Sequence, residues 1–310
     1  MLCIPGRSKG YNMMKSAANS GNRLHSSDVA FAYKMITPTL IVLVCMSLFS
    51  FCFNAYYSLT DFYYIKKDAT SFIGLKNFAT LFKDTYFRSA LWNTVKFTVI
   101  CTLFETLFGL FAAVLVDSLK KFRSTVRTLI LVPYLLPPVT AALIWQSMLS
   151  ANYGIINKAL AALNLPTFNW FFDIRTAMPV IILIDIWQCM PFCFLLIYAA
   201  LQSIPGDLYE AASIDGANQL MQFFHVTLPG IKNTLMLCLM LRTIDSFRMF
   251  DKINILTGGG PANTTATVTQ YIYTYGIKSL KFGFASAGTI VMALIVLFLS
   301  SAYIKQSMKK

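Results

Sequence analysis

Charged residues are scarce in this chain of 310 residues. They make up 13% of it, whereas hydrophobic residues make up 56% and aromatic residues 15%. A soluble globular domain carries about 25% charged residues, so the composition excludes that class, and the long apolar runs exclude a disordered chain. The composition therefore predicts an integral membrane protein.

Acidic residues are fewer than basic ones. The chain has 13 Asp and Glu against 26 Lys and Arg, which gives a formal net charge of +13. Such an excess could indicate nucleic-acid binding, but the cations are spread over many loops and form no basic surface with interleaved aromatics. We therefore expect these cations to meet the headgroups of membrane lipids and no nucleic acid.

Histidine is nearly absent, with His25 and His225 as its two occurrences. Cys189 and Cys193 lie one helical turn apart, but no histidine or suitably spaced acid completes a metal site with them. We expect the cysteines of the apolar segments to be packing residues. No metal site and no catalytic site are predicted, and Glu105 and Asp185 are interpreted as isolated acids, which disfavours a membrane-embedded enzyme.

A nucleotide-binding loop is also missing, because the chain contains no G-x-x-x-x-G-K-[ST] sequence. Gly258, Gly259, Gly260 and Pro261 form a glycine-rich run, yet they lack the lysine and the following helix that a phosphate loop requires. They are predicted to form a turn or a conformationally restricted loop on the extracytoplasmic side. The chain is therefore expected to bind no cofactor and to hydrolyse no ATP.

Apolar windows long enough to cross a bilayer as helices are abundant. About 20 residues are needed, and barrel strands would instead alternate with a period of two. Pro133, Pro137 and Pro138 should kink or break the start of the third window. The pattern predicts an all-α polytopic membrane protein with six transmembrane helices. They span about residues 35–60, 93–117, 126–149, 178–201, 233–256 and 282–304.

The remaining segments define the domain organisation and orientation. Residues 1–30 are polar and basic without the apolar core of a signal peptide, so we expect a flexible cytoplasmic tail before a transmembrane domain of residues 31–310. Six crossings place both termini on one side. The short turn from Lys120 to Arg127 carries four cations, which favours cytoplasmic termini.

The fifth window contains most of the charges found at membrane depth. Arg242, Asp245, Arg248 and Asp251 recur every three residues, so neighbours can pair along one side of a helix. Charges at this depth usually face the bundle interior or a wet cavity. They form either a self-neutralised structural ladder or one border of a solute path.

Two aromatic and amide pairs offer a second border for such a path. Trp145 precedes Gln146 in the third window, and Trp187 precedes Gln188 in the fourth. Amides and flat aromatic faces suit neutral, hydroxyl-rich solutes. The same four residues are equally compatible with packing and with an interfacial belt.

The segment at about 204–232 interrupts the apolar pattern, and no Lys or Arg occurs between Ile204 and Gly230. Asp207 and Glu210 have the spacing of a capping box, which predicts a short helix up to a break at Gly216. A second helix should follow and stop at Leu228 and Pro229. A helix resting on lipid headgroups would normally carry cations, so this helix-turn-helix is expected to bind a protein.

Several short motifs then indicate a family. Residues 210–212 read Glu-Ala-Ala, residues 215–217 read Asp-Gly-Ala, and residues 228–229 read Leu-Pro. The segment closely resembles the EAA loop of permease subunits in ATP-binding-cassette importers. The residues that carry this likeness are Glu210, Ala211, Ala212, Asp215, Gly216, Ala217, Leu228 and Pro229.

Other motifs are similar to those of the carbohydrate-specific branch of that family, the maltose and glycerol-phosphate type. They occur in the same order and cover about residues 30 to 305. They are GLKNFATLF (Gly74–Phe82), ALWNT (Ala90–Thr94), VPYLLPP (Val132–Pro138), FRMFD (Phe247–Asp251) and LTGGGPANTT (Leu256–Thr265).

The resemblance implies one of two homologous permeases in a bacterial-type cytoplasmic membrane, with two copies of an ATPase subunit and an extracytoplasmic solute-binding protein. The ATPase would use ATP and Mg, and the EAA helix would dock into it. The glycine-rich loop would lie near the binding-protein interface. A secondary transporter or channel remains the alternative, although no convincing internal repeat supports it. The solute itself cannot be named from the sequence.

Overall fold

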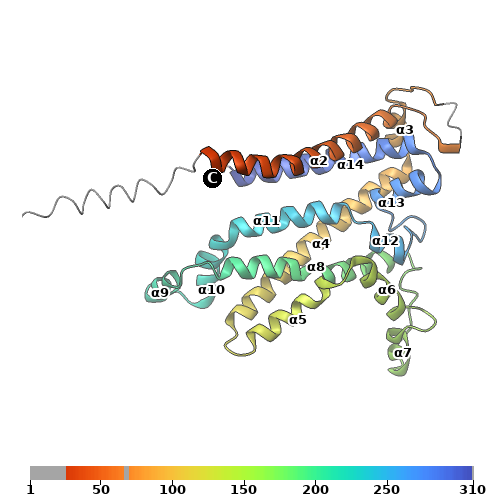
Figure 1. The fold of residues 1–310 in the computed structure, drawn as a ribbon. Helices are drawn as coiled ribbons and strands as arrows, with labels where there is room; N and C mark the ends of the chain where they lie inside the picture. Colours follow the sequence, from red (N-terminus) through yellow and green to blue (C-terminus); the bar gives the residue numbers. More distant parts are fainter. Residues whose placement is uncertain (1–25, 66–69, 309–310) are drawn as a thin grey trace, which may run out of the picture. The chain divides into compact units, whose positions relative to one another are not determined.

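The computed structural model describes residues 26–65 and 70–308, and most of them are helical (Figure 1). Within these ranges the isolated bridge between Thr60 and Phe72 is the sole strand-like pairing. Helices satisfy their own backbone hydrogen bonds, which a segment in hydrocarbon requires. The predicted all-α class is confirmed.

The chain divides into two compact units between Phe53 and Asn54. Within the first unit, the structure describes residues 26–53 of α2 (Ser26–Ser58), which are mostly apolar and are exposed wherever their side chains are described. The second unit holds the remaining elements. These are α3 (Lys76–Lys83), α4 (Thr85–Ser118), α5 (Arg123–Leu135), α6 (Pro138–Met148), α7 (Ile155–Ala162), α8 (Ala177–Leu201), α9 (Gly206–Ile214), α10 (Gln219–Gln222), a π-helical turn (Phe223–Thr227), α11 (Leu228–Phe247), α12 (Asp251–Leu256), α13 (Val268–Tyr273), a second π-helical turn (Thr274–Lys278) and α14 (Phe282–Met308).

Five helical segments of the described chain are long and apolar enough to cross a membrane, and a bent pair brings the number to six if it counts as one span. That pair is α5 and α6, which meet at an angle of 92°. The bend falls at Leu136 and Pro137, where proline removes a backbone donor. The predicted count of six is compatible with this arrangement, and the kink expected from the prolines becomes a near right angle.

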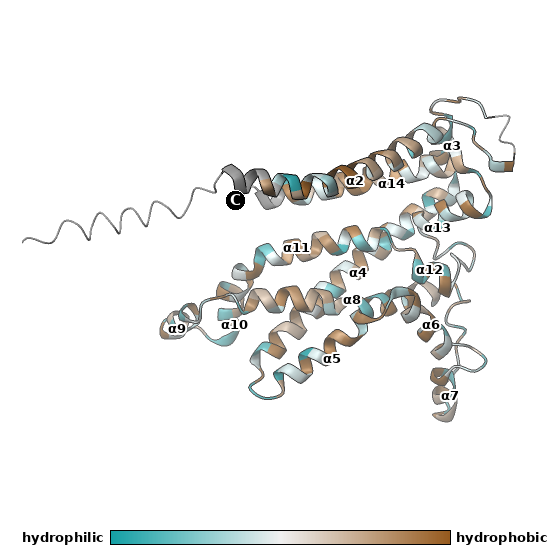
Figure 2. Cartoon of the chain, viewed as in Figure 1, coloured by the Kyte–Doolittle hydropathy of each residue, from teal (hydrophilic) through white to brown (hydrophobic). Residues whose placement is uncertain are grey.

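The core of the second unit is built around α4 and α8. A Cβ atom added to Gly109 would lie 2.7 Å from Cys193 Cβ and 2.8 Å from Phe194 N, so the two helices approach too closely for any side chain there. Small residues allow such an approach in membrane helices, where dispersion contacts replace the hydrophobic effect between helices. Figure 2 shows the apolar character that the long helices share.

The short helices of the second unit lie at its two ends. In Figure 1, α9 and α10 lie at one end, whereas α3, α7 and α12 lie at the other. The loop predicted to leave the bilayer is therefore separated from the glycine-rich loop that follows α12 by the length of the long helices.

Candidate functional site: buried charges, a cavity and an exposed loop

Four charged side chains from four helices form a buried charge cluster. Glu105 lies on α4, Asp185 on α8, Arg242 on α11 and Lys252 on α12, and none is more than 2% exposed. Arg242 binds Glu105 through two bonds, Nε to Oε2 at 2.7 Å and Nη2 to Oε1 at 3.0 Å. Lys252 Nζ pairs with Asp185, whose other oxygen lies 3.7 Å from Arg242 Nη2. Two anions and two cations thus neutralise one another.

The cluster corrects the interpretation of Glu105 and Asp185 as isolated acids. Each of them is paired with a cation from the fifth predicted span, 137 and 67 residues further along the chain. A charge without a partner would be very costly at this depth, so pairing across helices fixes how α4, α8, α11 and α12 meet. The sequence could have indicated this pairing, because acids in two apolar windows are matched by bases in another. The spacing of charges within a single window could not indicate it.

The three-residue ladder of the fifth span is only partly formed. Arg242 Nη1 lies 2.8 Å from Asp245 Oδ2, and Arg248 Nη2 lies 3.7 Å from Asp245 Oδ1. Asp245 and Arg248 have side chains that are 62% and 60% exposed. The helix ends at Phe247 and a new one begins at Asp251, so the ladder does not continue to Asp251 along one helix.

A cavity of about 510 Å³, here called the charged cavity, lies at this helix break. Four of the predicted path residues line it together with Lys252, namely Gln188, Asp245, Arg248 and Asp251. Gln188 is 3% exposed and donates from Nε2 to the carbonyl of Leu136 at 2.8 Å, while its Oε1 has no hydrogen-bond partner. A buried acceptor without a partner carries a desolvation penalty, which a hydroxyl donor in the cavity would remove.

The other predicted path residues lie outside the lining of the charged cavity. Trp145 and Trp187 pack edge to face, with ring centroids 5.4 Å apart. Gln146 donates to the carbonyl of Ile255 on α12 at 3.0 Å. These contacts join α6 to α8 and α12.

Three acidic and thiol groups, Cys101, Glu105 and Asp185, lie close enough together to offer ligand atoms to one metal ion. Both carboxylates, however, are already bound by Arg242 and Lys252. The two carboxylates therefore serve as ion-pair partners, and we assign no metal to these three residues.

The glycine-rich loop is packed against α4. Gly258 and Gly259 have positive φ angles of 61° and 94°. Asn93 donates to the carbonyls of Asn263 and Ala266 at 3.1 Å each. Two of the motifs recognised in the sequence, ALWNT and LTGGGPANTT, are therefore in direct contact.

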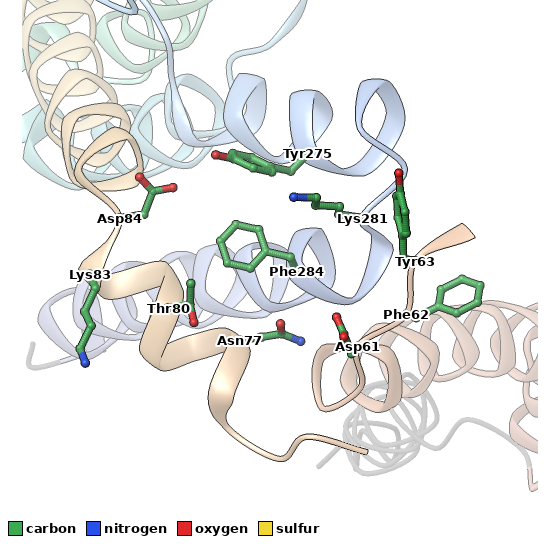
Figure 3. Close-up of a pocket in the computed structure, with 10 residues that line it drawn as sticks. All are labelled: Asp61, Phe62, Tyr63, Asn77, Thr80, Lys83, Asp84, Tyr275, Lys281 and Phe284. Atoms are coloured by element: carbon green, nitrogen blue, oxygen red, sulfur yellow. The ribbon is translucent and has the colours of Figure 1, made fainter. Parts of the chain in front are cut away.

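A larger cavity of about 720 Å³, here called the α3 cavity, lies between α3, residues 61–63 and the start of α14 (Figure 3). Lys281 points into it, near the rings of Tyr275 and Phe284. Asp84 accepts hydrogen bonds from Tyr86 N at 2.8 Å and from the Tyr271 hydroxyl. Burial raises the pKa of the Tyr271 phenol, and its hydrogen bond to Asp84 raises that pKa further.

The loop around α9 and α10 has no buried side chain in either helix. Ile214 is 87% exposed and Leu220 is 68% exposed, although both are apolar. Glu210 and Asp215 are exposed as well. The loop residues of the resemblance thus belong to a surface that the described residues leave largely uncovered.

Two local expectations for this loop are wrong. Pro205 is the N-cap of α9, so Asp207 lies in the first turn and makes no capping bond. Leu228 and Pro229 begin α11 and do not end a helix, because the π-helical turn over Phe223–Thr227 leads straight into it. A wider turn suits this place because Pro229 has no N–H to donate. The expected helix break at Gly216 is present, because α9 ends at Ile214 and Gly216 has a positive φ of 79°.

Comparisons with known proteins agree on one kind of protein. A family model described as "Binding-protein-dependent transport system inner membrane component" matches residues 105–306. The chain is 33% identical over 288 residues to the trehalose/maltose transport system permease protein MalF of Thermococcus litoralis, covering 93% of this chain and 97% of that one. It is 32% identical to the sulfoquinovosyl glycerol transport system permease protein SmoG of Agrobacterium fabrum, with 91% and 92% covered. It is 33% identical to the sn-glycerol-3-phosphate transport system permease protein UgpA of Escherichia coli, with 86% and 90% covered.

A solved structure supports the fold. One chain of a bacterial alginate ABC transporter in complex with an alginate pentasaccharide-bound periplasmic protein has a TM-score of 0.79 at 24% identity. The match covers 90% of the present chain and 94% of that one.

Proposed function

The chain belongs to the family of binding-protein-dependent transport system inner membrane components, and we propose that it is one permease subunit of an ATP-binding-cassette importer for a sugar or sugar-like solute. Similar proteins are named for trehalose and maltose, for sulfoquinovosyl glycerol and for sn-glycerol-3-phosphate, which all carry several hydroxyl groups. A secondary transporter or channel is the less favoured alternative.

The α9–α10 loop is the observation that carries this proposal. It exposes apolar and acidic side chains together and contains no Lys or Arg between Ile204 and Gly230. Anionic lipid would favour a cationic helix face, whereas a groove on another protein can cover exposed apolar residues such as Ile214 and Leu220. The loop, with its motif residues from Glu210 to Pro229, is proposed to dock into the ATPase subunit.

The division of labour follows from what this chain lacks. Its sequence has no phosphate loop, so ATP and Mg would be bound by two copies of the separate ATPase subunit and no cofactor by this chain. A second, homologous permease and an extracytoplasmic binding protein complete the proposed assembly. The α9 end would then face the cytoplasm together with both termini, and the glycine-rich loop would face the binding protein.

Solute would pass through the charged cavity. Its wall combines an unpaired amide oxygen of Gln188 with the exposed carboxylate of Asp245 and guanidinium of Arg248. Such groups offer donors and acceptors in the number that a polyhydroxyl solute needs. The buried pairs behind this wall would keep the surrounding helices in place.

Co-purification tests the assembly most directly. The tagged chain, extracted from its native membrane in mild detergent, should bring with it an ATPase whose activity rises when a solute-loaded binding protein is added. The melting temperature of that binding protein would then identify the solute, because ligand binding stabilises the folded state. Solute uptake driven by an ion gradient, without an associated ATPase, would instead support the alternative.

The proposed path predicts that Gln188→Ala and Asp245→Asn change which solute is preferred. The expected result is a shift of about fivefold or more in the ratio of uptake rates for two solutes, such as trehalose and glycerol 3-phosphate, because one hydrogen bond is worth about 1 kcal/mol. Thr243→Val is a matched control on α11, since its hydroxyl bonds to Leu239 and lies outside the lining of the charged cavity. An unchanged ratio with normal uptake in both variants would remove these residues from the path.

A further inference from the structure

A third cavity, here called the amide pocket, lies at the opposite end of α6 from the charged cavity. Its volume is about 400 Å³, within the range of about 300–1,000 Å³ that is usual for small-molecule sites. Its polar lining comes from amides and hydroxyls, and no charged residue of the described chain lines it. These polar residues are Gln146, Ser150, Asn152, Tyr153 and Asn169.

The charged cavity and the amide pocket are both lined by α6 and α12 or by residues next to them. Pro138 at the start of α6 lines the charged cavity and Leu149, just after its end, lines the amide pocket. At a rise of 1.5 Å per residue these positions are about 16 Å apart. Likewise, Lys252 of α12 lines the first and Leu256 the second. The amide pocket is therefore one short step along α6 and α12 from the charged cavity.

Hydrogen-bonding groups in the amide pocket are available to a ligand. The side chains of Asn152 and Asn169 make no hydrogen bond with the residues that the structure describes, and neither do the hydroxyls of Ser150 and Tyr153. Amides and hydroxyls can both donate and accept, as the hydroxyls of a sugar require.

Aromatic rings supply the apolar part of the lining. Trp170 borders the pocket, and Tyr153 and Phe172 are 65% and 79% exposed. The absence of charge separates this pocket from the α3 cavity, which is lined by two acids and two lysines (Figure 3). An uncharged lining of rings and amides fits a neutral, hydroxyl-rich ring and offers nothing to balance the charge of an ionic ligand.

The pocket is held in shape before any ligand binds. Asn157 of α7 donates to the carbonyl of Phe168 at 2.9 Å and accepts from the indole of Trp170 at 2.9 Å. A Cβ atom at Gly154 would lie 2.4 Å from the carbonyl oxygen of Ser150, so the turn before α7 is closely packed. A preformed site loses less conformational entropy on binding.

We propose that the amide pocket is a saccharide subsite, which takes a neutral sugar ring before it moves along α6 and α12 to the charged cavity. This inference rests on the proposed function and adds to it a second binding position and a class of solute, the uncharged saccharides.

The test compares the double variant Asn152→Leu and Asn169→Leu with the wild type in proteoliposomes that contain the whole complex. Leucine keeps the branched heavy-atom arrangement of asparagine and removes its hydrogen bonds, so the maximal rate of saccharide uptake should fall about tenfold. The concentration of binding protein that gives half this rate should stay unchanged. Thr80→Val, in the α3 cavity, is the matched control and should leave both values unchanged.

The fluorescence of the Trp170 indole measures saccharide binding in the pocket directly. Trehalose added to the purified complex without binding protein should change the tryptophan fluorescence of the wild type, and Trp170→Phe and the double variant should each abolish this change. Glucose at the same concentration should also give a signal, whereas sodium glucuronate, which differs from glucose in carrying a carboxylate, should give none.

Two outcomes would overturn the inference. A rise in the half-saturating concentration of binding protein, with the maximal rate unchanged, would make the pocket a surface for docking that protein. Wild-type uptake and an unchanged trehalose signal in the double variant would leave the pocket without a ligand role. Failure of the proposed function is distinct, because the wild-type complex itself would then show no ATP-driven uptake.

Discussion

In the buried charge cluster every residue is at most 2% exposed and has an oppositely charged partner. In the α9–α10 loop, by contrast, Asp207, Glu210 and Asp215 are exposed and have no ion pair within the described chain. Apolar residues show the same contrast, since the loop leaves Ile214 and Leu220 uncovered. The cluster is complete within one chain and fixes how its helices meet. The loop is proposed to be covered by a partner, so changes in the two regions should damage different properties.

Removing a cation from the cluster should have the largest effect on stability. Arg242→Met leaves Glu105 buried without a partner, which typically costs about 3–5 kcal/mol. We expect a strong loss of folded protein, measured as abundance in the membrane and as melting temperature in detergent.

Arg248→Met is the control for this change. It removes a guanidinium that is 60% exposed on the same stretch of chain and should alter stability by less than about 1 kcal/mol. Adding Glu105→Gln to Arg242→Met should restore part of the loss, because no unpaired charge is then left. Equal stability of the Arg242 and Arg248 variants would contradict the account of the cluster.

The glycine-rich loop should show an intermediate effect. Gly259 has φ at 94°, and an added Cβ would lie 3.2 Å from Ala266 Cβ and from Gln270 Cγ. Gly259→Val therefore strains the loop by about 1–3 kcal/mol, and we expect transport to fall more than abundance. Gly258→Asn is the control, because Asn tolerates positive φ and the added Cβ has only Asn254 O at 4.0 Å. An equal loss of transport and abundance would show that the loop contributes to folding alone.

The smallest effect is expected at Tyr271, which is fully buried outside the spans. Tyr271→Phe removes the hydroxyl donor to Asp84 and should lower the free energy of unfolding by about 1 kcal/mol. Because its folded-state pKa is raised, the folded state holds the phenolic proton more tightly, so wild-type stability should fall as pH rises above about 10.

Chemical denaturation between pH 7 and pH 11 measures both effects. The variant should lose part of the decline at high pH, and Tyr273→Phe, a half-buried neighbour in α13, should keep it. A variant with the wild-type pH profile would show that Tyr271 does not contribute to it.

Local composition was enough to predict the helices and the bend near Pro137, because the bilayer imposes length and apolarity on each span separately. Gly216 was predicted as a break because positive φ favours glycine. The pairing of Glu105 with Arg242 was not predicted, because it depends on how helices separated by 137 residues pack. The same reason explains the contact of Asn93 with the glycine-rich loop.

Predictions from short motifs were less reliable where a proline changes the position at which a helix begins. Asp207 had the spacing of a capping residue, but Pro205 has extended backbone two residues earlier and takes the N-cap position. Pro229 was predicted to end a helix, yet proline is well tolerated in a first turn, and α11 begins there. The coupling role of the loop and the roles of the path residues stay predictions.

ATP-driven solute uptake by the Glu210→Lys variant tests the contrast between the two regions most directly. Glu210 is exposed and has no ion pair with the described residues, so the account predicts an unchanged melting temperature in detergent and a loss of uptake of about tenfold or more, as expected when a charge faces a partner of the same sign. Gly216→Trp, whose added Cβ would have nothing within 4 Å in the described chain, should also stop uptake, whereas Gly216→Asn, which tolerates the positive φ better, should retain it. Normal uptake with Glu210→Lys would contradict the coupling role of the loop.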